Sequence, residues 1–311
     1  MIDVSIIIVS WNVADMLLDC LESIEAAQTR HPAISLEVIV VDSASQDDTV
    51  ARVRQRFPQV RLLSQTENVG FTRGSNLGLA QARGRALFLL NPDTLIIGEA
   101  ISLMLAHLDT HPQVGIVGPH TLNGDGSTQS SRRCFPTRRI AFFESTWLQS
   151  LAPQRWLDDY TLAQADDRAT LDVDWVQGSA LMLRRAVYEQ IGGLDEAYVM
   201  YYEELDFCKR AKDAGWRVVY LGQAQIIHHG GASSEQSGAW KHIHFQRSKL
   251  RYFRKTYGPS FAALLRSFLL MSYGAQLLLE ALKGLLGHKR ALRRQRVDVY
   301  LQVLRDGLLV T

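Results

Sequence analysis

The chain has 311 residues, of which 47% are hydrophobic, and this is enough for one large or two small globular domains. Aromatic and β-branched residues are too frequent for a disordered or collagen-like protein. The three cysteines are widely spaced, which argues against a disulfide framework or a cysteine-rich zinc site and favours a reducing compartment.

The formal net charge of +2 conceals an uneven distribution along the chain. Residues 241–296 hold 13 of the 34 lysine and arginine residues but only one of the 32 acids, so this segment carries +12. The remainder of the chain therefore carries −10. An acidic body with a basic end points to an anionic partner such as a membrane, a nucleic acid or a phosphorylated substrate.

The sequence lacks the usual pattern of a secretory signal. The apolar run near the N-terminus is short, and Asp3 stands where a signal peptide has basic residues. The longest apolar stretch, at residues 267–279, is shorter than the about 20 residues that a spanning helix needs. We therefore expect a cytoplasmic protein without a membrane-spanning helix.

The first part of the sequence alternates between β-branched runs and amphipathic stretches. Strands are predicted at residues 4–9, 36–41, 60–64 and 86–90, and helices at 13–27, 48–57 and 101–108, with a further helix after a glycine-rich loop. Strands that alternate with helices of this length predict an α/β fold with a mostly parallel sheet covered on both faces.

The pattern becomes less regular after residue 117. Strands are predicted at residues 114–117, 173–183 and 216–221, helices at 184–191 and 203–214, and an irregular polar stretch at 151–168. From residue 240 onward the chain is expected to be helical and basic. We expect one α/β domain at 1–235 and a basic amphipathic helical region at 236–311.

Polar residues follow the first two predicted strands, where ligands bind in open α/β sheets. Ser10 and Asn12 follow the first strand without a glycine-rich dinucleotide fingerprint. Asp42 follows the second strand, where a carboxylate can accept hydrogen bonds from a base or a ribose. The alternative is a turn acid that leads into a helix cap.

A glycine-rich stretch at residues 68–78 surrounds the predicted start of a helix. Gly70 and Gly74 would let the backbone approach a ligand closely, and a helix N-terminus favours anions. Asn76 lies in the same stretch and is either a ligand contact or a solvated helix residue.

Asp93 follows four apolar residues of the fourth predicted strand, where a carboxylate needs a partner. One such partner is Mg²⁺ or Mn²⁺ bridging the phosphates of a nucleotide, whereas a turn that caps the next helix is an equal alternative. His228 is a second candidate metal ligand, although a lone histidine is more often structural.

The densest group of candidate catalytic residues lies at residues 192–210. Glu203, Glu204 and Asp206 stand there among aromatic residues. The helix dipole explains acids in a first turn but not their apolar neighbours. A carboxylate in a partly dry site has a raised pKa and can act as a general base.

In order along the chain, these motifs resemble the family 2 inverting glycosyltransferases, and within them the bacterial rhamnosyltransferase-like members. The resemblance covers about residues 3–235 and rests on VSIIIVSWN, VVDSASQDDT, NVGFTRGSNLG, LNPDT, GGLDE, YYEELDFCKR and IIHHGGASS. It implies a GT-A fold, a nucleotide-sugar donor and a divalent metal. The donor-binding half would be about 1–120 and the acceptor half about 121–235.

The resemblance also implies roles for single residues in the donor-binding half. Asp42 would bind the base or ribose of the donor, with Ser10 and Asn12 nearby. Asp93 matches the last acid of the family's Asp-x-Asp motif, whose first acid is replaced here by Asn91. The glycine-rich stretch with Gly70, Gly74 and Asn76 would complete the donor site.

Further residues are implied for the metal, the diphosphate and the acceptor. His228 matches a later histidine that helps to hold metal or pyrophosphate. Glu204 occupies the position of the catalytic base, where the family usually has aspartate, so Glu203 and Asp206 remain alternates. Arg132, or its neighbour Arg133, would meet the diphosphate or the acceptor.

The expected reaction is inverting, metal-assisted transfer of a sugar to a lipid-linked or surface-polysaccharide acceptor, with dTDP-rhamnose as the first donor to test. The basic helical region would bind the anionic inner face of the plasma membrane rather than nucleic acid, or pack on the catalytic domain or a second subunit of a homo-oligomer. The alternatives are a metal-dependent nucleotidyltransferase and, less well supported, a non-catalytic nucleic-acid-binding protein.

Overall fold

The computed structural model describes residues 1–230, 238–287 and 289–310. The chain divides into two compact units, and the first comprises Met1–Phe135, Thr161–Val199 and the stretch that begins at Glu203. The second comprises Pro136–Tyr160, Met200–Tyr202 and the C-terminal helices. The boundary expected near residue 235 lies outside the described residues. The structure also assigns two segments from within the expected α/β domain to the C-terminal unit.

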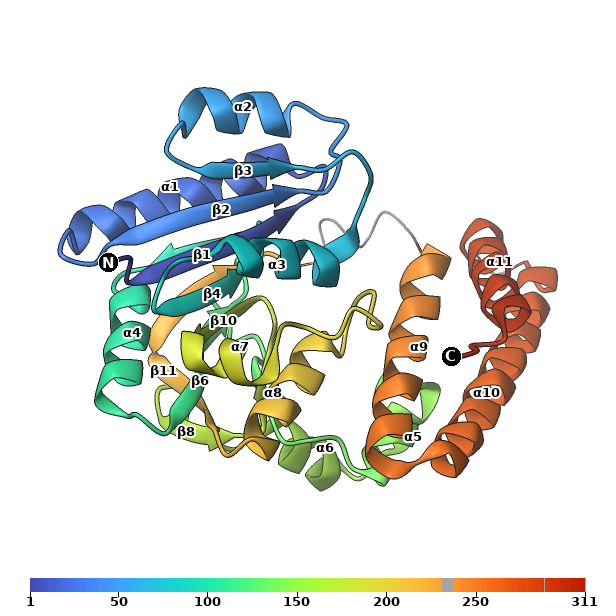
Figure 1. Cartoon of the computed structure of the whole chain (residues 1–311). Coiled ribbons are helices and arrows are strands. Elements are labelled where there is room, and N and C mark those ends of the chain that lie inside the picture. The colour runs from blue at the N-terminus through green and yellow to red at the C-terminus, as the bar shows by residue number, and fades with distance from the viewer. Residues whose placement is uncertain (231–237, 288, 311) are drawn as a thin grey trace. The chain divides into compact units, whose positions relative to one another are not determined.

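Strands make up the centre of the first unit. The bounds are β1 (Val4–Ser10), β2 (Leu36–Asp42), β3 (Arg61–Ser64), β4 (Ala86–Leu90), β5 (Thr94–Ile97), β6 (Val114–Leu122), β7 (Arg132–Arg133), β8 (Thr170–Val173), β9 (Trp175–Val176), β10 (Ala180–Arg184) and β11 (Arg217–His228). A nine-stranded sheet has the order β3-β2-β1-β4-β10-β6-β11-β5, with β8 paired to β11, while β7 and β9 form a separate pair (Figure 1).

The strands β3, β2, β1 and β4 are parallel, as the alternation of strands and helices predicts. β10 runs antiparallel to β4 and β6, and β11 runs parallel to β6. Every residue of β1 is buried, which explains why its sequence is a continuous apolar run rather than an alternating one. The carboxyl ends of the parallel strands therefore form one edge of the sheet, where ligands are expected.

Helices cover both faces of this sheet. Their bounds in the first unit are α1 (Ala14–Arg30), α2 (Thr49–Arg56), α3 (Gly70–Gln81), α4 (Ala100–Thr110), α7 (Arg185–Ile191) and α8 (Glu203–Asp213). Residues of α1, α2 and α4 join Ile6 and Ile8 in the main core. On the other face, α3 lies so close to β1 that a Cβ on Gly78 would stand 2.3 Å from Ile7 Cγ2.

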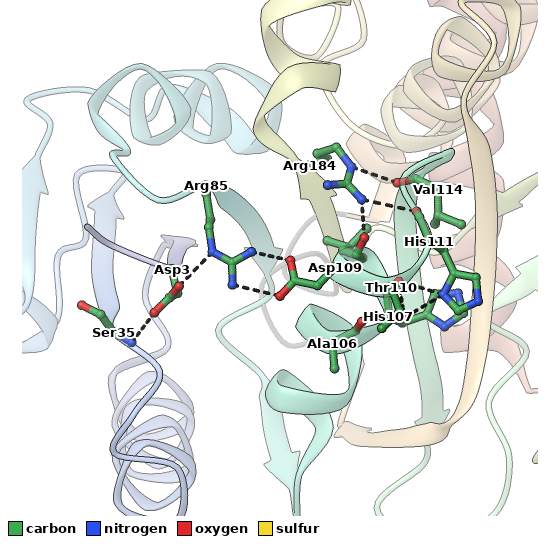
Figure 2. Close-up of polar contacts among 11 residues, drawn as sticks. Asp3, Ser35, Arg85, Ala106, His107, Asp109, Thr110, His111, Val114 and Arg184 are labelled. Carbon is green, nitrogen blue, oxygen red and sulfur yellow. Dashed lines mark hydrogen bonds and ion pairs between the residues drawn. The ribbon is translucent and has the colours of Figure 1, made fainter.

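The opposite edge of the sheet is held by arginines (Figure 2). Arg85 donates to Asp3 Oδ1 at 2.8 Å and also forms an ion pair with Asp109. Arg184 donates to the carbonyl oxygens of Val114 and His111 at 3.2 and 3.3 Å. These contacts join the start of β1, the approach to β4 and the end of α4 away from the ligand-binding edge.

Several strands differ from those expected. The structure adds β5, β7 and most of β8, and β6 extends beyond residue 117 to Leu122. The single strand expected at 173–183 is interrupted by a turn at residues 177–179, because β9 pairs with β7 whereas β10 pairs with β4 and β6. The strand expected to end at Leu221 continues to His228. An irregularity between Leu221 and Gln225 breaks the alternation of side chains there and conceals the continuation.

The second unit is helical. Its elements are α5 (Arg138–Phe143), a 3-10 helix (Trp147–Leu151), α6 (Gln154–Thr161), α9 (Gly238–Tyr257), α10 (Pro259–Leu285) and α11 (Arg290–Asp306). Lys249 of α9 is fully buried and donates to the carbonyl oxygen of Glu144 at 2.7 Å. Glu280 of α10 is buried, and its Oε2 lies 2.5 Å from Nη1 of Arg293 in α11.

The 27-residue helix α10 is long and apolar enough to cross a membrane, judged by length and composition, because an 18-residue stretch within it has a mean hydropathy of 1.4. The expectation that no such segment exists is therefore revised. It counted only the uninterrupted apolar run at 267–279, whereas the helix begins at Pro259, before Arg266. Core helices of other proteins have the same length and composition, so these properties alone do not establish a span.

Candidate active site

Ser10 and Asp42 are register partners at the ends of β1 and β2, and both are buried, Asp42 with 1% exposure. The N–H of Ser45 donates to Asp42 Oδ2 at 3.1 Å. Ser10 Oγ and Asp42 Oδ1 have no hydrogen-bond partner among the described residues. Since a buried polar atom without a partner is costly, these two atoms suit the N–H or hydroxyl group of a ligand.

Asn12 fixes the loop that follows β1. Its φ of +53° is in the left-handed region. Its Oδ1 accepts from the N–H of Gln46 at 2.7 Å, and its own N–H donates to Ser45 Oγ at 3.0 Å. Asn12 thus ties the end of β1 to the loop around Asp42 and shapes the site that was expected to bind the donor.

The glycine-rich stretch makes mainly protein contacts. Gly70 starts α3 with a φ of +72°, and a Cβ on Gly74 would lie 2.8 Å from Val9 Cγ1. Gly74 therefore permits close packing of α3 on β1. The amide of Asn76 exchanges hydrogen bonds of 2.9 Å with the backbone of Leu194 and donates to Glu196 at the same distance. Because this amide is engaged within the protein, we do not carry Asn76 into the donor site.

The structure brings Asp93 and His228 together, although they are far apart in the sequence. Their Oδ1 and Nε2 atoms lie 3.3 Å apart, and both side chains are buried. The antiparallel pairing of β5 with β11 sets this contact, because His228 pairs with Thr94. The N–H of His229 also donates to the carbonyl oxygen of Asp93 at 3.0 Å.

Gln129 orients the imidazole of His228. Gln129 Oε1 lies 2.7 Å from His228 Nδ1, and Gln129 Nε2 donates to Asn123 Oδ1 at 2.9 Å. An amide oxygen only accepts, so in the neutral imidazole Nδ1 carries the proton and Nε2 presents a lone pair beside Asp93. Gln129 was not among the site residues predicted from the sequence. The only signal was its place in the stretch that leads to Arg132.

One hard carboxylate and one imidazole nitrogen are suitable ligands for Mg²⁺ or Mn²⁺. Within the described ranges, no group of three or more His, Cys, Asp or Glu residues is placed to hold a metal ion. An ion at Asp93 and His228 would therefore take its remaining ligands from substrate phosphates or water, as Mg²⁺ commonly does. The residues present fit a metal that binds together with a nucleotide.

Glu203 and Glu204 open α8 in an environment that disfavours charge. Glu203 is buried, and the Oε2 atoms of both residues have no hydrogen-bond partner in the part of the chain that the structure describes. Burial raises the pKa of Glu204. Burial and the neighbouring charge of Glu204 together raise the pKa of Glu203 well above its ordinary value. Such a pKa suits general-base chemistry.

Glu204 packs against the turn between β9 and β10. A Cβ on Gly178 would lie 3.3 Å from the Cβ and 3.5 Å from the Cδ of Glu204. Burial raises the pKa of Glu204. A backbone hydrogen bond from Gly178 and the positive charge of Arg133 partly offset this rise. The N–H of Asn91 donates to the carbonyl oxygen of Ser179 at 2.9 Å, so the same turn is fastened to the end of β4.

Two expected site residues form hydrogen bonds or ion pairs within the protein. Asp206 accepts from Arg210 Nε at 2.9 Å and from the hydroxyl of Tyr198 at 3.3 Å. Arg132 is buried and forms an ion pair of 2.8 Å with Asp167. The contacts of Asp206 favour Glu204 over Asp206 as a base.

Sequence comparison gives the family and the relatives of this chain. The model of glycosyl transferase family 2 matches residues 5–192. N-acetylglucosaminyl-diphospho-decaprenol L-rhamnosyltransferase of Mycobacterium tuberculosis is 30% identical over 218 residues, which cover 66% of this chain and 70% of that protein. Low-salt glycan biosynthesis hexosyltransferase Agl10 of Haloferax volcanii is 29% identical over 232 residues, which cover 72% of this chain and 66% of that protein.

Solved structures support the fold. The mannosyltransferase PcManGT of Pyrobaculum calidifontis, in complex with GDP-Man and Mn²⁺, has a TM-score of 0.55 at 18% identity and covers 97% of this chain and 84% of its own. Residues 1–349 of TarS from S. aureus give a TM-score of 0.53 at 16% identity, and the match covers 99% of this chain and 89% of that chain. The expected GT-A-like α/β fold is confirmed.

These findings decide between the function classes that the sequence left open. The family match spans more than half of the chain and includes the strand ends that carry Ser10, Asp42 and Asp93. Membership of this family explains the site without the nucleotidyltransferase or the nucleic-acid-binding interpretation, and we retain neither. The chain belongs to glycosyl transferase family 2 and is a glycosyltransferase.

Proposed function

We propose that the enzyme transfers a sugar, with inversion, from a nucleoside-diphosphate donor to a lipid-linked or surface-polysaccharide acceptor. The observation that carries this proposal is that the buried pair of Asp93 and His228 and the half-buried carboxylate of Glu204 are joined through one turn of the same unit. The rhamnosyltransferase of M. tuberculosis among the relatives makes dTDP-rhamnose the first donor to test.

The donor's nucleoside would bind at the ends of β1 and β2. Asp42 Oδ1 would accept a hydrogen bond from an N–H of the base or a hydroxyl of the ribose, and Ser10 Oγ would take a second polar atom. Both are buried without a partner among the residues described, so binding would satisfy groups that folding leaves unsatisfied. Asn12 would hold the loop around them in place.

The donor's diphosphate would lie beside Asp93 and His228. Mg²⁺ or Mn²⁺ held there would supply positive charge to the departing nucleoside diphosphate, as a Lewis acid does. Gln129 keeps the Nε2 lone pair of His228 available by holding the proton on Nδ1. The structure of PcManGT contains GDP-Man with Mn²⁺, which supports this part of the proposal.

Glu204 would be the general base. It would take the proton of the acceptor hydroxyl onto a carboxylate oxygen while the hydroxyl oxygen attacks the anomeric carbon opposite the departing diphosphate. Attack from that side inverts the configuration. The raised pKa of Glu204 and its carboxylate oxygen without a partner within the described chain both fit this role.

A donor screen tests the proposed function. The purified protein is incubated with Mn²⁺, a lipid-diphosphate-linked N-acetylglucosamine acceptor and one of dTDP-rhamnose, UDP-N-acetylglucosamine or GDP-mannose. We expect dTDP to be released and rhamnose to appear on the acceptor, with the configuration at the anomeric carbon inverted. Release of UDP or GDP instead would contradict the assignment of rhamnose. Retained configuration would contradict the base role of Glu204.

We also propose that the second unit binds an anionic membrane at the cytoplasmic face. Large apolar side chains are exposed along α10, among them Leu264, Met271 (69% exposed), Leu278 (65% exposed) and Leu285. Their spacing of seven residues places them on one face of the helix. Lysines and arginines dominate the charge of this region. An apolar face combined with basic residues suits an interfacial helix, and each base near an anionic surface contributes about 1 kcal/mol.

Vesicle flotation tests this surface with the full chain. Met271→Gln combined with Leu278→Gln should weaken binding to vesicles of mixed neutral and anionic lipid by more than about tenfold, because each buried Leu or Met side chain contributes about 1.5–3 kcal/mol. The matched control replaces Leu151 and Leu309, which are also exposed, by glutamine. Equal flotation of the two variants would contradict the proposal. The proposal would also be contradicted if the wild type is a dimer and only the α10 variant is a monomer.

A further inference from the structure

The turn at residues 177–179, between β9 and β10, is held by its backbone on both sides. The N–H of Gln177 donates to the carbonyl oxygen of Ser131 at 2.9 Å. The carbonyl oxygen of Ser179 accepts from the N–H of Asn91 at the same distance. Backbone hydrogen bonds, rather than side chains, therefore fix the position of the turn relative to the neighbouring strands.

In this turn Ser179 is buried, with 3% exposure, and Gln177 is half-buried. Each has a buried polar atom, Ser179 Oγ and Gln177 Oε1, without a hydrogen-bond partner among the described residues. Each such group disfavours folding by about 1–3 kcal/mol. Ser10 Oγ, Asp42 Oδ1 and the Oε2 atoms of the two glutamates of α8 share this property. Those four residues belong to the proposed active site, whereas other such atoms, among them His120 Nδ1 and Gln246 Oε1, lie outside it.

Strand register places the turn at the ligand-binding edge of the sheet. Ala180 pairs with Leu90, and Leu90 pairs with Ile8, so Ser179 lies at the same edge as Ser10. Side chains alternate along β10, and Ala180 belongs to the main core, so Ser179 is on the other face of the sheet. That face is the one that α3 covers.

The neighbours of the turn connect it with both halves of the proposed chemistry. Gly178 lies beside Glu204, because a Cβ added to it would stand 3.3 to 3.5 Å from side-chain atoms of Glu204. Asn91, which holds Ser179, also places its Nδ2 3.3 Å from His228 Nε2. In an in-line displacement the transferred sugar lies between the attacking hydroxyl and the departing diphosphate. In the proposed mechanism the turn would therefore lie beside the transferred sugar.

We infer that Ser179 Oγ and the side-chain amide of Gln177 hydrogen-bond the hydroxyl groups of the transferred sugar and determine which sugar is accepted. This inference rests on the proposed function. A sugar hydroxyl both donates and accepts, and so it satisfies the amide oxygen of Gln177 and the hydroxyl of Ser179. A site built to pair with a substrate hydroxyl rejects sugars that lack it, because its own buried groups then stay unpaired.

Binding measurements on the full chain test the inference, with dTDP-rhamnose and dTDP as the pair of probes. The variants are Ser179→Ala and Gln177→Ala, and Gln223→Ala, an exposed glutamine of β11, is the control. We expect each turn variant to weaken dTDP-rhamnose binding by roughly tenfold while dTDP binding changes less than about twofold. The control should bind both probes as the wild type does.

Thermal unfolding supplies a second readout that does not depend on the donor. Removing an unsatisfied buried hydroxyl should leave the melting temperature of Ser179→Ala unchanged or raise it. A lower melting temperature together with weaker binding of both probes would show a structural role and overturn the inference. If both turn variants prefer dTDP-rhamnose over dTDP as strongly as the wild type does, the inference is also overturned.

The two proposals fail in different ways. A wild-type protein that binds none of the dTDP-, UDP- or GDP-linked sugars contradicts the proposed function itself. The melting temperatures of the turn variants still show, in that case, whether the two polar groups serve folding. If another nucleotide sugar binds, that sugar and its nucleoside diphosphate replace the first pair of probes.

Discussion

Replacing Glu204 by glutamine should reduce sugar transfer by about 10²- to 10⁴-fold, the usual contribution of a positioned general base. Glutamine keeps the size of the side chain and its contact with Gly178 but does not accept the proton of the acceptor hydroxyl. The measurement is single-turnover release of nucleoside diphosphate in the presence of acceptor. Donor binding should stay close to that of the wild type, because the acceptor's proton is not involved in it.

The pH profile gives an independent check of the same role. The base must be ionised, and burial raises the pKa of Glu204 above the ordinary value of 4.5. Transfer by the wild type should therefore rise with pH through a value higher than 4.5. In Glu204→Gln the remaining activity should lack this rise. A rise that persists unchanged in the variant would assign it to another group.

Control variants separate the base from other acids of the first unit. Glu189, an exposed carboxylate on α7, provides a matched glutamate-to-glutamine control that should transfer sugar as the wild type does. Glu203→Gln and Asp206→Asn test the alternates. A larger loss in either of these than in Glu204→Gln, with folding preserved, would reassign the base. Near-wild-type transfer by Glu204→Gln would contradict the proposed mechanism.

The placement of the principal site residues was predictable because it follows from strand ends. Ser10, Asp42 and Asp93 each come directly after or at the end of an apolar run, and such runs form the buried parallel strands of an α/β sheet. Parallel strands bring their carboxyl ends to one edge, so residues distant in sequence are expected to lie close together. The meeting of Asp93 and His228 depends on the later strand β11 continuing to His228.

Contacts between side chains distant in sequence were not predictable. Asn76 has the setting of a ligand-binding residue in the sequence, yet its amide is engaged by Leu194 and Glu196. Gln129 carries no local pattern that reveals its bond to His228, 99 residues away. The strand at residues 173–183 was predicted as continuous, although Gly178 is a residue type that often marks a bulge or a break in a strand. The break coincides with a change of pairing partner, which the sequence does not show.

The assignment of residues 136–160 to the second unit illustrates the same limit at a larger scale. The sequence predicted an irregular polar stretch at residues 151–168 and no helix in this segment, whereas α5, the 3-10 helix and α6 form there. The hydrophobic pattern also does not show against which surface these helices pack. In the structure, the carboxylate of Glu144 accepts from the hydroxyls of Tyr160 and Tyr202, both at 2.8 Å, and its carbonyl oxygen accepts from Lys249. Such contacts depend on the tertiary structure and leave no periodic signal in the sequence.

The second large effect is expected at the Asp93–His228 pair. Asp93→Asn keeps the shape of the side chain but removes its negative charge, and His228→Ala removes the imidazole. Each should reduce transfer by about 10²-fold or more, because a metal ion contributes several kcal/mol of charge stabilisation to a departing group. Exhaustive treatment of the wild type with EDTA should cause a comparable loss that Mn²⁺ restores.

Metal affinity provides the readout that does not depend on turnover. Titration with Mn²⁺ in the presence of dTDP, followed by electron paramagnetic resonance, should show weaker binding in both variants. Gln129→Ala should weaken Mn²⁺ binding by about 10- to 100-fold, the usual effect of removing an outer hydrogen-bond partner of a metal ligand. His228 and Asp93 remain in that variant, so a loss there identifies the orientation of the imidazole as the cause.

Asp109→Asn is the matched control for Asp93→Asn. Asp109 lies at the opposite edge of the sheet, where it pairs with Arg85 (Figure 2). Its side chain is 43% exposed, and a pair so exposed contributes only about 0–1 kcal/mol to stability, so its loss should change neither Mn²⁺ binding nor transfer. If Asp93→Asn binds Mn²⁺ as tightly as Asp109→Asn does, or if EDTA leaves transfer intact, the metal lies elsewhere or takes no part in the reaction.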